Sequence, residues 1–355
     1  MKSNFVIQRN EVTKNLGYIK WMLPRSFASL WMTILSLFLC FPCQVEAQES
    51  FRVMFWNVEN LFDTKDDPQK NDNEFLPDAI RHWNYFRYRD KLKNLAKGII
   101  ASGREYVPDL VGLCEVENDS CLYDLTRRSP LREAGYRYVI TDSPDQRGID
   151  VALLYQRGSF RLLQHQSIRI PNKRLKKDPT RDILHVVGKV LSGDSLDVFV
   201  CHMPSRRGGQ AKSEPYRLLT ARILKQAVDS VMAIRKSPHV VVMGDFNDYP
   251  TDKSMKILCS DDRLRNLMID RKEGTYRYRG EWGILDQFLV SENVKVKKVE
   301  ILRHPFLLEE DEKYGGDKPF RTYNGMKYLG GFSDHLPVSF DWEMVIRDDK
   351  DYYSE

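Results

Sequence analysis

Short apolar segments that stop at a polar or charged side chain recur along the chain, and they constrain its fold more than any other feature. Residues 51–58 and 110–116 are two such segments, and their β-branched and aromatic residues are typical of buried strands. Between them, Leu92, Leu95 and Ile99 recur at helical spacing, which predicts an amphipathic helix over residues 88–102. This part of the chain therefore predicts a strand, helix, strand unit.

The rest of the chain repeats this alternation. A long helix is predicted at residues 214–234, and further strands are predicted at 151–155, 183–191, 196–203, 239–246 and 284–291. With 355 residues, of which 42% are hydrophobic and 30% charged, the chain can bury a large core. Because strands and helices interleave without a linker, we expect one α/β domain in which two packed mixed β-sheets are flanked by helices.

The first 47 residues differ in composition from the remainder. Lys14, Lys20 and Arg25 precede an apolar run at residues 27–41, and small residues follow at 45–47. The run is about 15 residues long, shorter than the roughly 20 that span a bilayer, so this layout predicts a cleaved signal peptide. We expect export to the periplasm or the medium, with no membrane association after cleavage.

Cysteines raise two further questions. Cys40 and Cys43 allow a lipid-modified cysteine, but Leu39 and Pro42 precede them where a lipoprotein signal has a small residue, so this anchor is less favoured. Four cysteines remain beyond the leader, and buried free thiols are favoured over a disulfide because they lie in or near apolar segments. These cysteines are Cys114, Cys121, Cys201 and Cys259.

The leader also carries most of the net charge. Residues 1–47 hold five basic and two acidic side chains, a charge of +3, so only +2 of the total +5 belongs to the mature chain. A charge this small gives little general attraction to nucleic acid and does not identify a substrate. We expect residues 48–345 to form the domain and the acidic residues 346–355 to form a frayed tail. No stable protein partner is evident.

The polar residues at the segment ends are of the types that bind metal ions or phosphate. Each has an ordinary alternative as a surface carboxylate or strand cap, but a buried strand rarely carries an unpaired charge, because burying one costs several kcal/mol. Their joint occurrence predicts that they converge on one site. The residues are Asn57, Glu115, His202, Asp245 and Asp286.

The residue types also indicate a chemistry. Glu115 with Asp334 and the amide of Asn57 suits Mg²⁺ or Mn²⁺, which prefer oxygen ligands, whereas zinc fits poorly because no close group of His and Cys occurs. The GDFND segment places Asp245 two residues before Asn247, so that a carboxylate and an amide can orient a water and a phosphoryl oxygen.

A second pair of groups completes this chemistry. The SDH segment sets His335 beside Asp334, and Asp286 can hold the imidazole charged and oriented. A charged donor of this kind stabilises the charge that develops when a phosphoester is attacked.

In this order along the chain, the motifs WNVEN, LCEVEN, RGIDVALLY, CHMPSR, GDFND, ILDQFLVS and SDHLPV resemble those of the endonuclease/exonuclease/phosphatase family. That family includes deoxyribonuclease I and the inositol polyphosphate 5-phosphatases. The resemblance covers essentially the whole mature chain. It implies a four-layered, deoxyribonuclease I-like sandwich and a phosphoesterase that depends on a divalent metal.

The resemblance also implies a role for each site residue. Glu115 is the expected principal metal ligand, with Asn57, Asp334 and Glu59 near the ion. Asp245 is expected to orient or deprotonate the attacking water. Phosphate is expected to contact His202, Asn247 and His335, with Asp286 as the carboxylate partner of His335. Two positions depart from the usual pattern: Cys114 stands where many relatives have glutamine, and Gln287 where they have tyrosine.

Substrate choice must come from the loops. Basic residues after residue 168 and after His202, together with Tyr276, Tyr278 and Trp282, favour DNA or RNA and hence an endonuclease or another phosphodiesterase. A phosphatase or phosphodiesterase for a lipid or sugar phosphate is the alternative, and a binding protein without catalysis is the third reading. The candidate phosphate contacts are Arg147, Arg181, Arg206 and Arg207.

Overall fold

The computed structural model describes residues 49–171 and 179–344. The predicted signal peptide, the tail and the basic residues Lys173, Arg174, Lys176 and Lys177 lie outside these ranges. Across the described residues, no helix is both long and apolar enough to cross a membrane.

The first sheet has six strands. Its central pair, β1 and β2, is parallel, with Asn57 opposite Cys114, while the other neighbours run antiparallel. In spatial order the strands are β13 (Val296–Ile301), β18 (Val338–Met344), β1 (Glu49–Leu61), β2 (Leu110–Val116), β4 (Asp150–Tyr155) and β3 (Arg137–Ile140).

The second sheet repeats this plan. It also has one parallel pair, β7 and β8, in which His202 lies opposite Asp245. In spatial order its strands are β5 (Phe160–Ile168), β6 (Ile183–Val190), β7 (Ser195–His202), β8 (His239–Asp245), β12 (Asp286–Ser291) and β9 (Leu264–Asn266).

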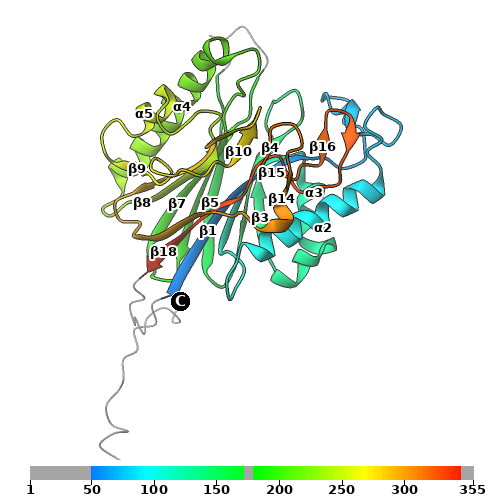
Figure 1. Cartoon of the computed structure of the whole chain (residues 1–355). Coiled ribbons are helices and arrows are strands. Elements are labelled where there is room, and N and C mark those ends of the chain that lie inside the picture. Colours follow the sequence, from blue (N-terminus) through cyan, green and yellow to red (C-terminus); the bar gives the residue numbers. More distant parts are fainter. Residues whose placement is uncertain (1–48, 172–178, 345–355) are drawn as a thin grey trace, which may run out of the picture. The chain divides into compact units, whose positions relative to one another are not determined.

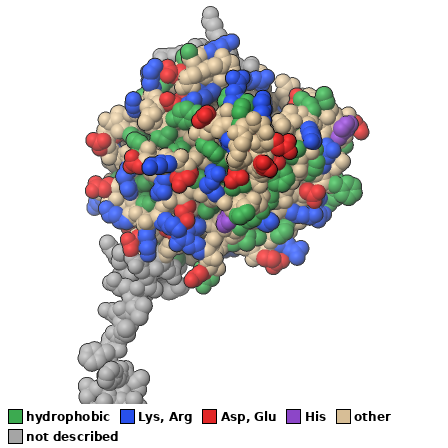
Figure 2. Space-filling model, in the orientation of Figure 1, with side chains coloured by type: hydrophobic (Ala, Val, Ile, Leu, Met, Phe, Trp, Pro, Cys, Tyr) green, Lys and Arg blue, Asp and Glu red, His purple; other side chains and the backbone are tan. Residues whose placement is uncertain are grey.

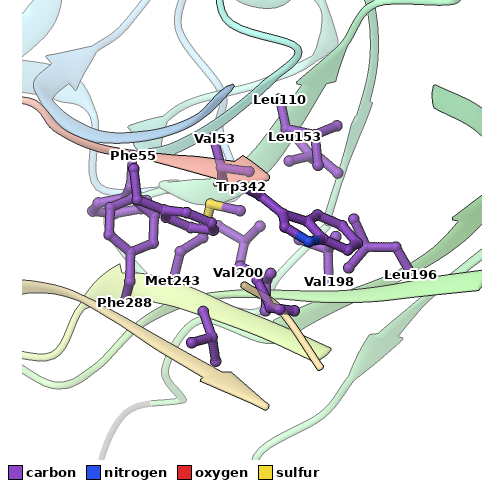
Figure 3. Packing of buried hydrophobic residues seen from close by; sticks show 14 of the residues in the cluster. Val53, Phe55, Leu110, Leu153, Leu196, Val198, Val200, Met243, Phe288 and Trp342 are labelled. Atoms are coloured by element: carbon purple, nitrogen blue, oxygen red, sulfur yellow. The ribbon is translucent and has the colours of Figure 1, made fainter. Parts of the chain in front are cut away.

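Alternation of side chains along the strands produces the central core. In β1, Val53 and Phe55 point toward the second sheet, and in β8 Met243 points back toward the first. Figure 3 shows these side chains packing with Phe288 and Trp342 between the two sheets. Because successive residues of a strand face opposite sides, the residues between them are left to pack against helices.

Those helices form the outer layers (Figure 1). Helices α2 (Tyr85–Ala101) and α3 (Asp119–Tyr123) cover the outer face of the first sheet, where Trp56 joins their apolar side chains. Helices α4 (Gln210–Ile234) and α5 (Lys253–Leu258) cover the second sheet through Leu224 and Val242. The predicted four-layered α/β sandwich is confirmed.

Two helix starts differ from the sequence prediction. Helix α2 begins at Tyr85, three residues before the expected start, because the Asn84 side chain accepts hydrogen bonds from the amides of Phe86 and Arg87 and caps the helix. Helix α4 begins at Gln210 rather than residue 214, so Pro215 lies inside its first turns.

Several short elements were not predicted. They include the strands β3, β5, β9, β13 and β18 and three two-stranded hairpins, β10 (Tyr276–Tyr278) with β11 (Glu281–Gly283), β14 (Leu308–Glu310) with β15 (Asp317–Pro319), and β16 (Tyr323–Asn324) with β17 (Lys327–Tyr328). The four cysteines of the described residues are free thiols, as expected.

Candidate active site

Strand register brings the predicted residues to one edge of the sandwich. Asn57 and Glu115 lie at or near the ends of the parallel strands β1 and β2, and His202 and Asp245 end the parallel strands β7 and β8. Asp286 instead begins β12, but β12 runs antiparallel to β8, so Asp286 pairs with Asp245. The first and second sheets therefore contribute residues to the same edge.

The carboxylate of Asp245 is the centre of this group. Its Oδ2 accepts a hydrogen bond of 3.0 Å from Asn57 Nδ2, and its Oδ1 accepts one of 2.9 Å from the backbone N–H of Asn247. Nε2 of His202 lies 3.6 Å and Nε2 of His335 3.9 Å from Asp245 Oδ2. Burial raises the pKa of this carboxyl to about 7, against the opposing effect of His335.

The two histidines hold different charges. Burial opposes the charge on His335, but Asp286 and Asp245 outweigh it and raise the pKa of His335 to about 10. Asp286 is fully buried and lies 2.7 Å from His335 Nδ1. Burial, together with the positive charges of Arg181 and Arg147, lowers the pKa of His202 well below its usual value. Near neutral pH, His335 is therefore a cation and His202 is neutral.

A second group of carboxylates adjoins the first. Glu59 is buried, and its side chain accepts hydrogen bonds from the amides of Thr322 and Tyr323. Its own N–H donates to Asn57 Oδ1 at 3.0 Å. Burial and the negative charge of Asp334 raise the pKa of Glu59. The acidic groups here are thus crowded enough to disfavour full ionisation without a cation.

Glu115 and Asp334 are the more accessible members of this group. Their side chains are 13% and 20% exposed, and each is approached by an arginine, Arg147 at 3.5 Å from Glu115 and Arg321 at 3.0 Å from Asp334. A set of carboxylate and amide oxygens fits a hard divalent cation such as Mg²⁺. The donor set therefore fits the predicted metal, with Glu115, Asp334, Asn57 and Glu59 as the residues to hold it.

A tighter cluster of potential ligands occurs elsewhere in the site. Asp245, Asp286 and His335 each offer one atom within 4.8 Å of the others. However, His335 Nδ1 is already hydrogen-bonded to Asp286, and the raised pKa of the ring keeps it protonated. Since a protonated imidazole cannot coordinate a cation, we interpret this trio as a proton-holding network rather than a metal centre.

Backbone strain is concentrated at this edge. Four non-glycine residues of the site have positive φ: Glu59 (48°), Asn60 (56°), Glu115 (64°) and Asn247 (50°). Such conformations are uncommon outside glycine and persist where the surrounding structure fixes them. Contacts of this kind hold Asn247, because its side-chain Nδ2 donates to the carbonyl of Met203 at 3.0 Å.

The predicted phosphate-binding arginines occupy different environments. Arg181 is buried and bonds to Asp145 and to the carbonyl of Met203, and Arg206 pairs with Asp248 and Asp252. Arg207 is exposed, and the side chain of Arg147 is 43% exposed beside Glu115. On the face drawn in Figure 2, acidic and basic side chains are intermingled.

The three aromatic residues of the β10–β11 hairpin also differ in their exposure to solvent. Tyr276 is partly buried and packs on His335 with ring centroids 4.8 Å apart, whereas Tyr278 is exposed. Trp282 is covered by the guanidinium of Arg303 at 4.3 Å. Of the three, Tyr278 presents the most open surface.

Two basic residues of the site were missed from the sequence. Lys91, on α2, is almost fully buried and donates to Thr322 Oγ1 and the Phe332 carbonyl, each at 2.6 Å. Burial lowers the pKa of Lys91 to about 8, although Glu59, Asp334 and Glu115 oppose this shift. Arg321 bridges Asp334 and Glu59. Lys91 could have been found from the sequence, because it falls among the apolar residues on the inward face of the predicted helix. No local pattern marks Arg321.

The chain matches a known protein family. The sequence model of the endonuclease/exonuclease/phosphatase family matches residues 52–344. No curated protein matches the chain.

Several solved structures are similar in fold. A mannosyl-6-phosphatase of Bacteroides thetaiotaomicron has a TM-score of 0.56 at 16% identity, over 83% of this chain and 100% of that one. The catalytic domain of human Nocturnin has a TM-score of 0.54 at 19% identity, over 84% and 96%. TDP2 of D. rerio, in complex with a single-strand DNA product, has a TM-score of 0.54 at 14% identity, over 83% and 100%. The family match covers most of the chain, which therefore belongs to the endonuclease/exonuclease/phosphatase family.

Proposed function

We propose that this protein hydrolyses a phosphoester with the help of a divalent cation, Mg²⁺ or Mn²⁺. One observation carries the proposal: a buried carboxylate, Asp245, is held by Asn57 and faces a neutral and a protonated histidine. A carboxylate whose pKa is about 7 can accept a proton from water near neutral pH. The fixed groups around it are those that a phosphoryl centre requires.

The residues divide the work of hydrolysis. Asp245 takes a proton from a water as the water oxygen bonds to phosphorus and the ester O–P bond breaks. The protonated His335, held by Asp286, donates a hydrogen bond to a phosphoryl oxygen, and the leaving oxygen takes up a proton from solvent, to which Asp245 later returns its own. His202 and Asn247 bind the phosphate; the Asn247 amide has two N–H donors, so one can donate to phosphate while the other bonds Met203.

The metal would be held by Glu115, Asn57, Asp334 and Glu59. When bound, a divalent cation neutralises phosphate charge and stabilises the charge that develops in hydrolysis. Arg321 and Arg147 pair with the same carboxylates, at 3.0 Å from Asp334 and 3.5 Å from Glu115. Because of these ion pairs, we expect the divalent cation to compete with the guanidinium groups of Arg321 and Arg147 for the carboxylates.

Two substrate classes are candidates. The exposed Arg207 and Tyr278 support a nucleic acid and hence an endonuclease, and TDP2, which was solved with a single-strand DNA product, shares the fold. A pocket beside Glu59 supports a small phosphorylated molecule, and the mannosyl-6-phosphatase shares the fold.

We also propose that residues 1–47 direct export. N-terminal sequencing of the protein released by cells would test this, and an N-terminus at residue 1 would contradict it.

The proposed function is tested with purified protein, Mg²⁺ or EDTA, and a panel of plasmid DNA, RNA, a chromogenic phosphodiester, a phosphoinositide and hexose phosphates. We expect metal-dependent release of product from at least one of them. Asp245→Asn and Glu115→Gln should each lower kcat by a factor of about 100 or more. Asp90→Asn, on the exposed surface of α2, is the matched control. Equal activity in all three variants would disprove the assignment.

A further inference from the structure

A small pocket adjoins the site on the side of Glu59. Its volume is about 190 Å³, and Phe75, Arg81 and Trp83 in its lining take no part in the proposed hydrolysis. Its lining comes from β1, the segment before α2 and the β16–β17 hairpin, which meet only in the folded chain. This volume is below the range of roughly 300–1,000 Å³ that is typical of sites for drug-sized ligands, so it suits one small ring.

One wall of the pocket is aromatic and firmly held. Trp83 is fully buried, and its ring centroid lies 6.0 Å from that of Tyr323 and 6.2 Å from that of Phe75. The guanidinium of Arg81 lies 5.1 Å from the rings of both Phe75 and Tyr323. Arg81 also donates to the carbonyl of Gly325 at 2.8 Å, so its planar group is fixed as part of the wall.

The rest of the lining is shared with the proposed metal site. The backbone N–H of Asn60 donates to Glu115 Oε2 at 3.0 Å, and Arg321 donates to Asp334 Oδ2 at 3.0 Å. Glu59 also lines the pocket and is bonded to Asn57. Glu59, Asn60 and Arg321 thus belong to the pocket and also contact the proposed site, so the group esterified to a phosphate bound in that site can extend into the pocket.

The charges of the lining select among possible groups. Arg81 pairs with Glu74 at 2.9 Å, and Arg321 pairs with Asp334 and Glu59, so both positive charges are largely compensated. A second phosphate would gain little there. The lining offers donors from arginine and acceptors from amide, carboxylate and carbonyl groups, and a hydroxyl group both donates and accepts. Because Arg81 and Phe62 already cover the ring of Phe75, only its edge offers apolar contact to the C–H groups of a ring.

We infer that this pocket is a subsite for a single hydroxylated ring, a monosaccharide whose phosphate ester is the bond that the site hydrolyses. The inference rests on the proposed function and specifies its substrate class. Arg81 donates to the hydroxyl groups of the ring, the partly exposed edge of Phe75 contacts its C–H groups, and Asn60 links the subsite to Glu115. A polynucleotide does not need this pocket, because each of its phosphates is a diester that continues into a nucleotide on both sides.

The test compares Arg81→Met with Arg89→Met. Arg89 lies on the exposed face of α2 over Tyr85 and provides the matched control. In wild type we expect hydrolysis of a hexose 6-phosphate with higher kcat/KM than of glycerol phosphate. Arg81→Met should raise KM for the hexose 6-phosphate at least fivefold and leave kcat/KM for the chromogenic phosphodiester within twofold. Arg89→Met should change neither.

Binding without turnover provides a second readout. Titration of hexose 6-phosphate into the Asp245→Asn variant should give a Kd that Arg81→Met weakens at least fivefold, with unchanged thermal midpoints as the check on folding. If the wild type cleaves DNA or the chromogenic diester but Arg81→Met leaves hexose phosphate binding unchanged, the subsite is overturned and the proposed function stands. If the sugar phosphate binds through Arg81 but no ester is hydrolysed, the subsite stands and the proposed function fails.

Discussion

Among the described residues, buried ionisable side chains form several networks, and two of them share no residue. In the first, Asp286 and His335 lie at the edge of the sandwich that carries the proposed site. In the second, Arg52 bonds to Asp341 at 2.8 Å and to Glu300 at 3.0 Å, far along β1 from Asn57. A buried ion pair is weak evidence for stability, because desolvation offsets much of the attraction, whereas removal of one partner leaves the other unpaired. The second network can be tested without touching catalysis.

Glu300→Gln should destabilise the protein in a manner that depends on pH. Burial opposes ionisation of Glu300, but Lys298, Arg104 and Arg52 outweigh it and lower its pKa from 4.5 to about 2. A depressed acid pKa stabilises the fold above the unfolded value, and this contribution is lost as pH falls from about 4.5 toward 2. Since the group is partly exposed, we expect a loss of about 1 kcal/mol at pH 7.

Urea unfolding at pH 7 and pH 3 measures this difference. The gap between wild type and Glu300→Gln should shrink at the lower pH, and the exposed Glu281→Gln should show no gap at either. A gap that grows on acidification would show that the network does not hold Glu300 ionised.

Single residues of the site could be predicted where the chain itself marks them. Asn57, Glu115 and Asp245 stand where an apolar run stops, and parallel register then brings them together. Arg321 follows no apolar strand and reaches Asp334 only through the path of the segment after β15. Its place depends on contacts between distant parts of the chain, which local pattern does not encode.

Helix α2 does more than cover the first sheet. Lys91 and Asn94, one turn apart, hold the segment that precedes β18: Lys91 bonds to Thr322 and Phe332, and Asn94 Nδ2 donates to the carbonyls of Gly330 and Gly331. That segment carries Asp334. The helix therefore fixes one of the proposed metal ligands through backbone contacts, without contacting the substrate.

Lys91→Met should loosen this connection. The substitution keeps the length of the side chain but removes two hydrogen bonds and leaves the Phe332 carbonyl and Thr322 hydroxyl without their donor, which should cost about 1–3 kcal/mol. Lys93→Met, at an exposed position of the same helix, is the control. Thermal or urea unfolding measures both, and hydrogen exchange should rise in residues 320–334 only for Lys91→Met. An equal effect of the two substitutions would contradict this role.

Elements with a strong local hydrophobic pattern could be predicted from sequence, and elements without such a pattern could not. The inward strands β1, β2, β7 and β8 have continuous apolar runs, which local pattern identifies. Strand β5 was missed because most of its residues are exposed and its place depends on pairing with β6. Helix α4 begins at Gln210, before the predicted residue 214, and residues 210–213 add polar and small side chains that carry no apolar periodicity.

At the scale of the whole molecule, the two sheets share the construction of the site. Each has one parallel pair whose strands end in polar residues, and packing of the sheets brings the two pairs to the same edge. The similar solved structures have 14–19% identity to this chain, so they show its fold, and a fold alone does not fix a substrate. Close approach of the sheets is therefore the global feature on which the site depends.

Gly112→Ala tests that dependence. Gly112 lies in β2, and a Cβ there would meet Met243 Sδ of the other sheet at 2.4 Å and Phe55 at 3.1 Å. Because the core is closely packed, relief of this overlap requires a shift of Met243, and we expect a loss of about 1–3 kcal/mol in unfolding free energy. Gly158→Ala, which would meet no atom within 4 Å, is the control and should be neutral. Urea unfolding gives both values. Equal stability of Gly112→Ala and Gly158→Ala would show that the two sheets can adjust to an added methyl group. Close packing of the sheets would then not be what holds the common edge, and the loops would have to hold it.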